Sequence, residues 1–277
     1  MPGRPAAITI ITMTTVITIM DDEPDRDGGE FWRDRIPLDI AGGENADATS
    51  GQSADAAARL LIWLSPAFPV GSFAFSHALE WAVHRDKVSD VATTITWLGA
   101  LLEHGALRND AIFVSCAWRA TRARDARGLR EVNEQALAMA GSRERYLEAT
   151  AQGNAFVAII RQAWRAPGFD WASEHLKGDV AYPIAVGVVS AAHEIALGET
   201  LRSFVLAQIQ NLISAVIRLS VIGHTDGQRA IAALLPAIGA LAQTARSATL
   251  DDVGGAAFQS DIAAMAHETQ YSRLFRS

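Results

Sequence analysis

Apolar residues recur every three to four positions over almost the whole chain from Ala54 onward, and this spacing limits the fold more than any other feature. The same stretch is rich in Ala, Leu, Arg and Glu, which are good helix formers. Prolines are few and stand between the periodic segments, and no alternating pattern of strand length follows residue 55. The sequence therefore predicts an all-α domain.

We expect a single compact bundle of about ten helices over residues 56–277, with a disordered N-terminal extension over residues 1–55. No internal repeat and no Ser/Gly-rich linker divides the domain. The periodic segments predict helices over residues 54–64, 74–85, 89–106, 108–125, 128–140, 142–165, 172–177, 181–196, 199–222, 226–246 and 260–273.

Several predicted helix ends carry capping signals. Gly223 is expected to stop one helix in the left-handed conformation. Thr225 with Gln228 is expected to open the next helix with a capping box. Ser142 and Ser260 are expected as further N-caps.

The acidity of the chain lies in its first 55 residues. The net charge is −7, and residues 1–55, with four Arg against eleven Asp and Glu, account for all of it. A neutral domain argues against a nucleic-acid backbone as the main partner. Cys116 is the only cysteine, so an intrachain disulfide is excluded and a reducing cytoplasm is the expected compartment.

The extension begins with an uncharged, β-branched run from Ile8 to Met20. Its thirteen residues fall short of the ~20 that a spanning helix needs. Residues 21–55 are acidic and rich in Gly, Pro, Ser and Asp, which predicts disorder. We expect an extension outside the working fold, with Met13 or Met20 as alternative start sites; a targeting role or a transient β edge is the other interpretation.

Two segments allow two interpretations each. Residues 203–217 of one predicted helix carry no charge, which fits either the central helix of the core or a helix shared with a symmetric partner. The loop Ser65–Ser72 contains Pro66, Pro69 and Gly71 and should be stiff. The phenylalanines of this region, Phe68 and Phe73, either fold inward or form an apolar docking surface.

The chain closes with His267 to Ser277, HETQYSRLFRS. In a helix, Tyr271, Leu274 and Phe275 would share one face and would need a groove, in this chain or in a partner. The neighbouring Arg273 and Arg276 are typical of interfaces, whereas the plainer interpretation is a C-terminal helix docked on its own core.

Motifs of catalysis are absent from the sequence. It contains no Walker loop, GxGxxG or GxSxG motif. His193-Glu194 and His267-Glu268 both begin like HExxH, but each lacks the second histidine. The seven histidines show no i,i+4 pair, and His77 with His84 would make a weak site at best. The arginines between residues 119 and 130 are expected to form either a solvated surface or a binding surface for an acidic partner.

Three segments in order resemble the urease accessory protein UreF family. They are LSPAFPVGSFAFSHALEW from Leu64, NLISAVIRLSVIGHTDGQR from Asn211, and AMAHETQYSRLFRS at the end. ERYLEATAQGNAF from Glu144 and YPIAVG from Tyr182 are weaker matches. The resemblance covers about residues 57–277, and it departs from the family at Ala78, where glycine is usual, and at His224, where glutamine is usual.

The resemblance implies a non-catalytic chaperone for nickel insertion into urease. Such a protein forms a homodimer in the cytoplasm, binds UreD (UreH), recruits the GTPase UreG and docks on apo-urease. Nickel and GTP are handled by the partners, so no directly bound cofactor, catalytic residue or metal ligand is expected.

The resemblance also assigns residues. The matching partner-binding candidates are Glu80, His267, Glu268, Tyr271, Arg273, Leu274 and Phe275. Glu80 is expected to contact or control UreG, and the tail is expected to order on UreD. The matching structural positions are Pro66, Pro69, Gly71, Ser76, Arg218, Gly223, Thr225, Asp226 and Gln228. Two other classes of function remain as alternatives: a helical metal-dependent enzyme and a ligand-binding regulator.

Overall fold

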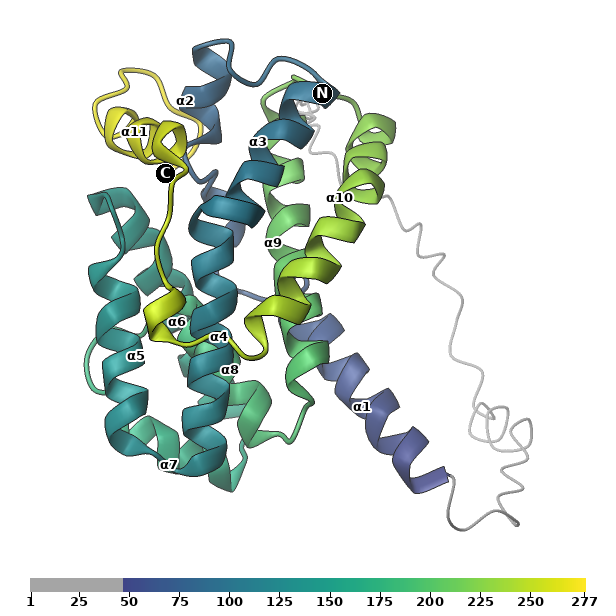
Figure 1. Cartoon of the computed structure of the whole chain (residues 1–277), viewed down its shortest axis with the longest axis vertical. Coiled ribbons are helices and arrows are strands. Elements are labelled where there is room, and N and C mark those ends of the chain that lie inside the picture. The colour runs from purple at the N-terminus through teal and green to yellow at the C-terminus, as the bar shows by residue number, and fades with distance from the viewer. Residues whose placement is uncertain (1–46) are drawn as a thin grey trace, which may run out of the picture. The chain divides into compact units, whose positions relative to one another are not determined.

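The computed structural model describes residues 47–277, with side chains from residue 54 onward, and every regular element in this range is helical (Figure 1). The expectations for residues 1–46 lie outside it. The elements are α1 (Asp47–Trp63), η1 (Ser72–Ala74), α2 (Leu79–His84), α3 (Val91–His104), α4 (Ala106–Ala123), α5 (Ala126–Ala138), α6 (Arg143–Ala163), α7 (Pro167–His175), α8 (Tyr182–Ala192), α9 (Leu197–Arg218), α10 (His224–Ala245), η2 (Leu250–Asp252) and α11 (Phe258–His267).

The predicted all-α architecture is confirmed, and the long helices lie close to their predicted ranges. Three helices start five or more residues away from their predicted starts, and one of them is α2, which begins at Leu79 rather than at 74. Helix α1 begins at Asp47 rather than at 54, and α7 begins at Pro167 rather than at 172. Proline has a fixed φ and no N–H, so it suits the first turn of a helix, which explains the earlier start of α7.

Helix α8 forms the centre of the bundle. Every residue from Tyr182 to Ala191 is buried, and α8 packs against α4, α6, α7 and α9. Two glycines make this packing close. A Cβ at Gly187 would lie 2.5 Å from the carbonyl oxygen of Val114 on α4, and a Cβ at Gly153 on α6 would lie 2.0 Å from that of Val180. Backbone therefore approaches backbone on two sides of α8.

Helix α9 is a core helix. It packs against α10, α4, α8 and α2, and nine of its residues, from Thr200 to Val216, are buried. By length and composition α9 is the one helix within residues 47–277 that would pass for a membrane span, and half of its most apolar window is buried inside the bundle. The interpretation as the central helix is wrong, because α8 takes that place and α9 is only partly buried. A symmetric partner on its open face stays a prediction.

The N-cap expectation at Ser142 is confirmed, because its side chain accepts from the backbone N–H of Arg145. The other capping expectations are wrong. Helix α10 begins right after Gly223, which is extended rather than left-handed, so Thr225 lies inside the first turn. The left-handed residue is Ser220, one residue after the α9 C-cap. Ser260 lies within α11, whose N-cap is Ala257.

The predicted helix over 260–273 is shorter than expected, since α11 ends at His267. Helix α11 lies beside α2 and also packs against α6. The ten residues that follow, 268–277, are non-helical, and we call them the C-terminal segment.

Gly187→Ala should lower the free energy of unfolding by about 3 kcal/mol, because the new methyl overlaps a backbone oxygen that cannot move aside. Gly239→Ala is the matched control: it also lies in a helix, and its Cβ would meet nothing within 4 Å. The control should be neutral or stabilising by up to about 1 kcal/mol. Urea denaturation compares the two; equal stabilities would contradict the close α4–α8 contact.

Candidate functional site

The C-terminal segment is bound to the loop before α2 through backbone hydrogen bonds. The N–H of Arg276 donates to the oxygen of Ala74 at 2.8 Å. The N–H of Ser76 donates to the oxygen of Ser277 at 2.8 Å, and the Ser76 hydroxyl donates to the same oxygen. Residues about 200 positions apart in the sequence thus pair side by side.

Two consecutive left-handed residues make this pairing possible. His77 and Ala78 have φ values of 56° and 60°, which interrupts the helix predicted over 74–85. Helix α2 therefore starts only at Leu79, and the backbone of residues 74–76 is left free to bond the C-terminal segment. A non-glycine residue is strained in this conformation, so glycine would suit position 78 better than alanine.

Glu80 anchors the C-terminal segment. One carboxylate oxygen accepts from the backbone N–H of Leu274 at 2.6 Å, and the other accepts from that of Phe275 at 3.0 Å. The second oxygen also lies 3.3 Å from Nε2 of His267. Since the Glu80 side chain is buried, these bonds replace the water that an ionised carboxylate needs.

His267 connects Glu80 to a second carboxylate. Its Nδ1 lies 2.5 Å from Glu144 Oε2, and the ring is fully buried. The other oxygen of Glu144 accepts from Nη1 of Arg273 at 2.5 Å. Helices α2, α6 and α11 are thereby joined to the C-terminal segment through one buried polar cluster.

Glu148, one turn along α6, completes the cluster. It accepts from the hydroxyl of Ser277 at 2.7 Å and from Nη1 of Arg145 at 2.6 Å, and it lies 2.9 Å from Nδ1 of His77. Burial alone would raise the pKa of Glu148, but Arg145, His77 and the hydrogen bond from Ser277 together hold it well below its usual range. Glu148 is therefore ionised at neutral pH.

Arg218 joins the C-terminal segment to the proline-rich loop. Its guanidinium lies 3.6 Å from the ring centroid of Phe73 and 4.4 Å from that of Phe275, and its Nη1 donates to the Phe73 oxygen at 2.5 Å. Of the two loop phenylalanines, Phe68 is buried against Phe156, whereas Phe73 is exposed. The inward-folding interpretation is therefore confirmed for Phe68, whereas a docking surface at Phe73 stays a prediction.

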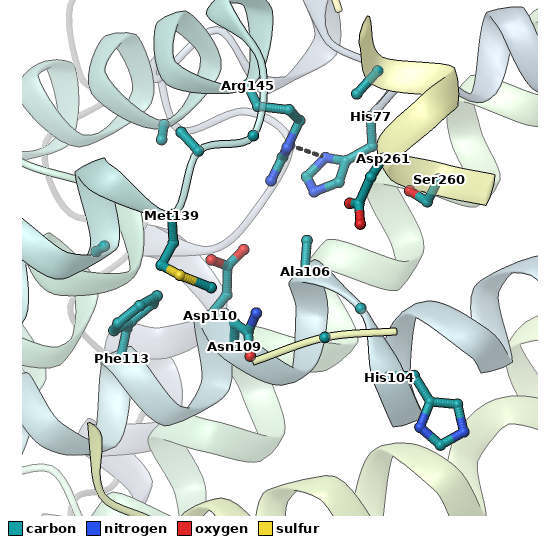
Figure 2. A pocket seen from close by; sticks show the side chains of 17 residues that line it. His77, His104, Ala106, Asn109, Asp110, Phe113, Met139, Arg145, Ser260 and Asp261 are labelled. Atoms are coloured by element: carbon teal, nitrogen blue, oxygen red, sulfur yellow. Dashed lines mark hydrogen bonds between the residues drawn. The ribbon is translucent and has the colours of Figure 1, made fainter. Parts of the chain in front are cut away.

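A cavity of about 230 Å³ lies beside the cluster (Figure 2). His77, Asp110, Arg145, Ser260 and Asp261 are among the residues that line it. Nε2 of His77 is buried and has no hydrogen-bond partner. Burial raises the pKa of Asp110, against the opposing charges of Arg145 and His77. Within residues 54–277, no three His, Cys, Asp or Glu side chains gather closely enough to hold a metal ion.

The structure brings most of the predicted partner-binding residues together, but they face in different directions. Glu80, His267 and Phe275 are buried, so in this conformation their side chains are not accessible to a partner. Tyr271 is fully exposed and Leu274 is 65% exposed. The expectation that Tyr271, Leu274 and Phe275 share one helix face is wrong, because the segment is non-helical.

Some of the remaining predicted residues have contacts within the domain, and others are exposed on its surface. Glu268 accepts from the backbone N–H of Arg143 at 2.7 Å. Gly71 is left-handed, with a φ of 76°, and lies in the turn after Pro69. Asp226 pairs with Arg229 on the exposed side of α10. Pro66, Gly223, Thr225 and Gln228 are exposed on the surface.

Sequence reasoning missed Glu144, Arg145 and Glu148, and it rated His77 as weak. A signal existed, because Glu144 and Glu148 are four residues apart and so share a helix face, in the segment with the weaker family resemblance. Four-residue spacing of acids is common on solvated helices, so nothing local marked these two as buried.

Comparison with known proteins agrees with this assembly of motifs. The family model described as UreF matches residues 88–235. The urease accessory protein UreF of Rhodopseudomonas palustris (strain HaA2) is 52% identical over 219 residues, which cover 79% of this chain and 92% of the relative. The UreF of Xanthobacter autotrophicus is 47% identical over 238 residues, covering 85% and 98%. That of Methylorubrum populi is 47% identical over 221 residues, covering 80% and 99%.

Glu148→Gln should lower the free energy of unfolding at neutral pH by about 3 kcal/mol, since Arg145 then loses its buried partner. The pKa of Glu148 is lower in the folded chain than its ordinary value of 4.5, so its ionised form stabilises the fold above pH 4.5. This stabilisation is lost as the pH falls below that value. The difference in the free energy of unfolding between Glu148→Gln and wild type should therefore become smaller below about pH 4.5. Urea titrations at several pH values measure this difference. Glu131→Gln, at an exposed position, is the control and should change the free energy of unfolding by less than about 0.5 kcal/mol.

Ala78→Gly should change the free energy of unfolding by less than about 1 kcal/mol, because relief of the left-handed backbone offsets the loss of a buried methyl. Ala82→Gly, at an equally buried position inside α2, should cost about 2 kcal/mol. Equal losses in thermal or urea unfolding would show that position 78 carries no backbone strain.

Proposed function

The chain belongs to the UreF family, and on this premise we propose that it is a non-catalytic scaffold for nickel insertion into apo-urease. It binds UreD (UreH) and recruits the GTPase UreG. This chain positions its partners relative to one another, while the partners bind nickel and GTP. We place this activity in the cytoplasm and assign it to a homodimer.

The observation that carries the proposal is the rigid presentation of apolar side chains by the C-terminal segment. Its backbone is held at Ser76 and Glu80, yet Tyr271 and Leu274 point away from the body. Exposed apolar groups on an ordered segment are typical of a protein-docking surface. The outer side of α11 extends this apolar character with Phe258, Ile262 and Met265, which are exposed at four- and three-residue spacing.

The contacts support a different role for each of the proposed partner-binding residues Glu80 and Arg273. Glu80 controls partner recruitment indirectly, by fixing the segment that partners contact. Arg273 is the charged group best placed to support UreG recruitment, because one of its nitrogens is held by Glu144 while its side chain stays 39% exposed. A guanidinium fixed at one end can still donate to a partner carboxylate or phosphate.

A ligand-binding regulator is the alternative that a specific observation favours. The cavity beside His77 is large enough for a small polar molecule, and Nε2 of His77 is available to it. A metal-dependent enzyme has no comparable support in residues 54–277.

Replacing both Tyr271 and Leu274 with serine should reduce the UreD and UreG recovered with the tagged full-length chain by tenfold or more, as expected for the loss of two central apolar contacts. The chain is co-expressed with UreD and UreG from the same genome, and the product is sized by light scattering. Leu235→Ser, at a 50% exposed position on α10, is the matched control and should recover both partners fully.

If the double variant still recovers both partners, the C-terminal segment is not the docking surface. If the unaltered chain recovers neither partner and remains monomeric, the scaffold proposal fails and the cavity becomes the leading site.

A further inference from the structure

The cavity beside the buried cluster contains a polar atom that the described chain leaves unsatisfied. His77 is 5% exposed, and its ring faces the cavity (Figure 2). Its Nε2 has no hydrogen-bond partner within residues 54–277. A buried polar atom without a partner is costly, so this one indicates a place where a molecule from outside the chain can bind.

Nε2 of His77 is a hydrogen-bond donor. Nδ1 of the ring lies 2.7 Å from Nη1 of Arg145 and 2.9 Å from Oε1 of Glu148. An arginine nitrogen can only donate, so Nδ1 accepts from Arg145 and the ring proton lies on Nε2. A ring with two protons would carry one on Nε2 as well. The inner end of the cavity therefore offers an N–H group, which needs an acceptor.

The charges around the cavity leave a carboxylate without a cation. The ionisable side chains that line it are His77, His104, Asp110, Arg145 and Asp261. The charge of Arg145 is directed to Glu148, at 2.6 Å, and the ion pairs among residues 54–277 include neither Asp110 nor Asp261. His104 and Asp261 are exposed to solvent at the mouth, whereas Asp110 is half-buried.

The surroundings of Asp110 show the same lack of a cation. Burial raises the pKa of its carboxyl, and the charges of Arg145 and His77 oppose this rise without cancelling it. A cation placed beside Asp110 would stabilise the ionised carboxylate. The cavity thus lacks a positive group at Asp110 and an acceptor at His77.

The size of the cavity suits a molecule of a few non-hydrogen atoms. Its volume of about 230 Å³ exceeds the ~30 Å³ of one water and falls below the ~300 Å³ at which pockets for drug-sized ligands begin. No three His, Cys, Asp or Glu side chains within residues 54–277 gather closely enough to hold a metal ion. A ligand that reaches both His77 and Asp110 is therefore a small molecule. Phe113 and Met139 add apolar surface for a short hydrocarbon link.

We propose that this cavity binds a small organic cation with an ammonium group at one end and an oxygen acceptor at the other. The ammonium donates to the carboxylate of Asp110, and the oxygen accepts from Nε2 of His77. Asp261, at the mouth, adds a second negative charge that attracts the cation. This site goes beyond the scaffold role, and a single chain contains all of it.

Titrations of the full-length chain with ethanolamine and with glycinamide, followed by amide chemical shifts, test the site. Both probes join an ammonium to an oxygen through a short link. They should bind with a Kd of about 1 mM, since so few atoms limit the affinity. The amides of His77, Asp110 and Ser260 should shift. Ethylene glycol, which lacks the charge, and glycolate, which reverses it, should bind about tenfold more weakly or less.

Asp110→Asn should weaken the binding of both cations by about tenfold, because an amide keeps the shape of the carboxyl and loses its charge. Asp251→Asn, at an exposed position outside the cavity, is the matched control and should keep the wild-type affinity.

A second variant covers the case in which Asp110→Asn fails to fold, as judged by circular dichroism. Ala106 lines the cavity from the first turn of α4 (Figure 2). Ala106→Leu fills the space and leaves every charge in place, so it should abolish binding of both cations.

Three results would each overturn the inference. The first is that neither cation saturates the chain below about 50 mM. The second is that ethylene glycol or glycolate binds as tightly as the cations. The third is that a folded Asp110→Asn or Ala106→Leu keeps the wild-type affinity. Capture of UreD and UreG is measured separately, so a failure of this site leaves the scaffold proposal standing.

Discussion

The structure depends on buried carboxylates that take hydrogen-bond donors from distant parts of the chain. Glu80 on α2 finds its donors in the backbone of Leu274 and Phe275, and Glu148 on α6 finds one in Ser277. Such groups are costly inside a protein unless each oxygen is bonded. The fold of the loop before α2, the end of α11 and the course of the C-terminal segment all serve this requirement.

The helical framework was predictable because its signal is local. Spacing of apolar residues located α3, α4, α6, α9 and α10 to within a few residues, and Ser142 was correctly identified as a cap. The failures came where long-range bonds override local preference. The pattern of Tyr271, Leu274 and Phe275 fits a helix, but Glu80 binds two of their N–H groups and keeps the segment from forming one.

Only part of the candidate site could be predicted from the sequence. Motif resemblance selected Glu80, His267, Arg273 and Phe275, which the structure brings together, but it assigned Glu80 an outward role. Composition cannot tell a buried glutamate from an exposed one when its partners are backbone groups almost 200 residues away. The left-handed backbone at Ala78, one of the positions where this chain departs from its family, was visible in the sequence only as a missing glycine.

The pairing of Ser76 with Ser277 spans 201 positions in the sequence, and it has a consequence for how the protein forms in the cell. The contacts among helices α3 to α10 involve no residue beyond Ala245, so they can form while synthesis continues. The loop before α2 cannot reach its final structure until nearly the whole described chain has left the ribosome. Until then Glu80 lacks the N–H groups of Leu274 and Phe275, and Glu148 lacks the hydroxyl of Ser277, so an early part of the sequence reaches its final structure last.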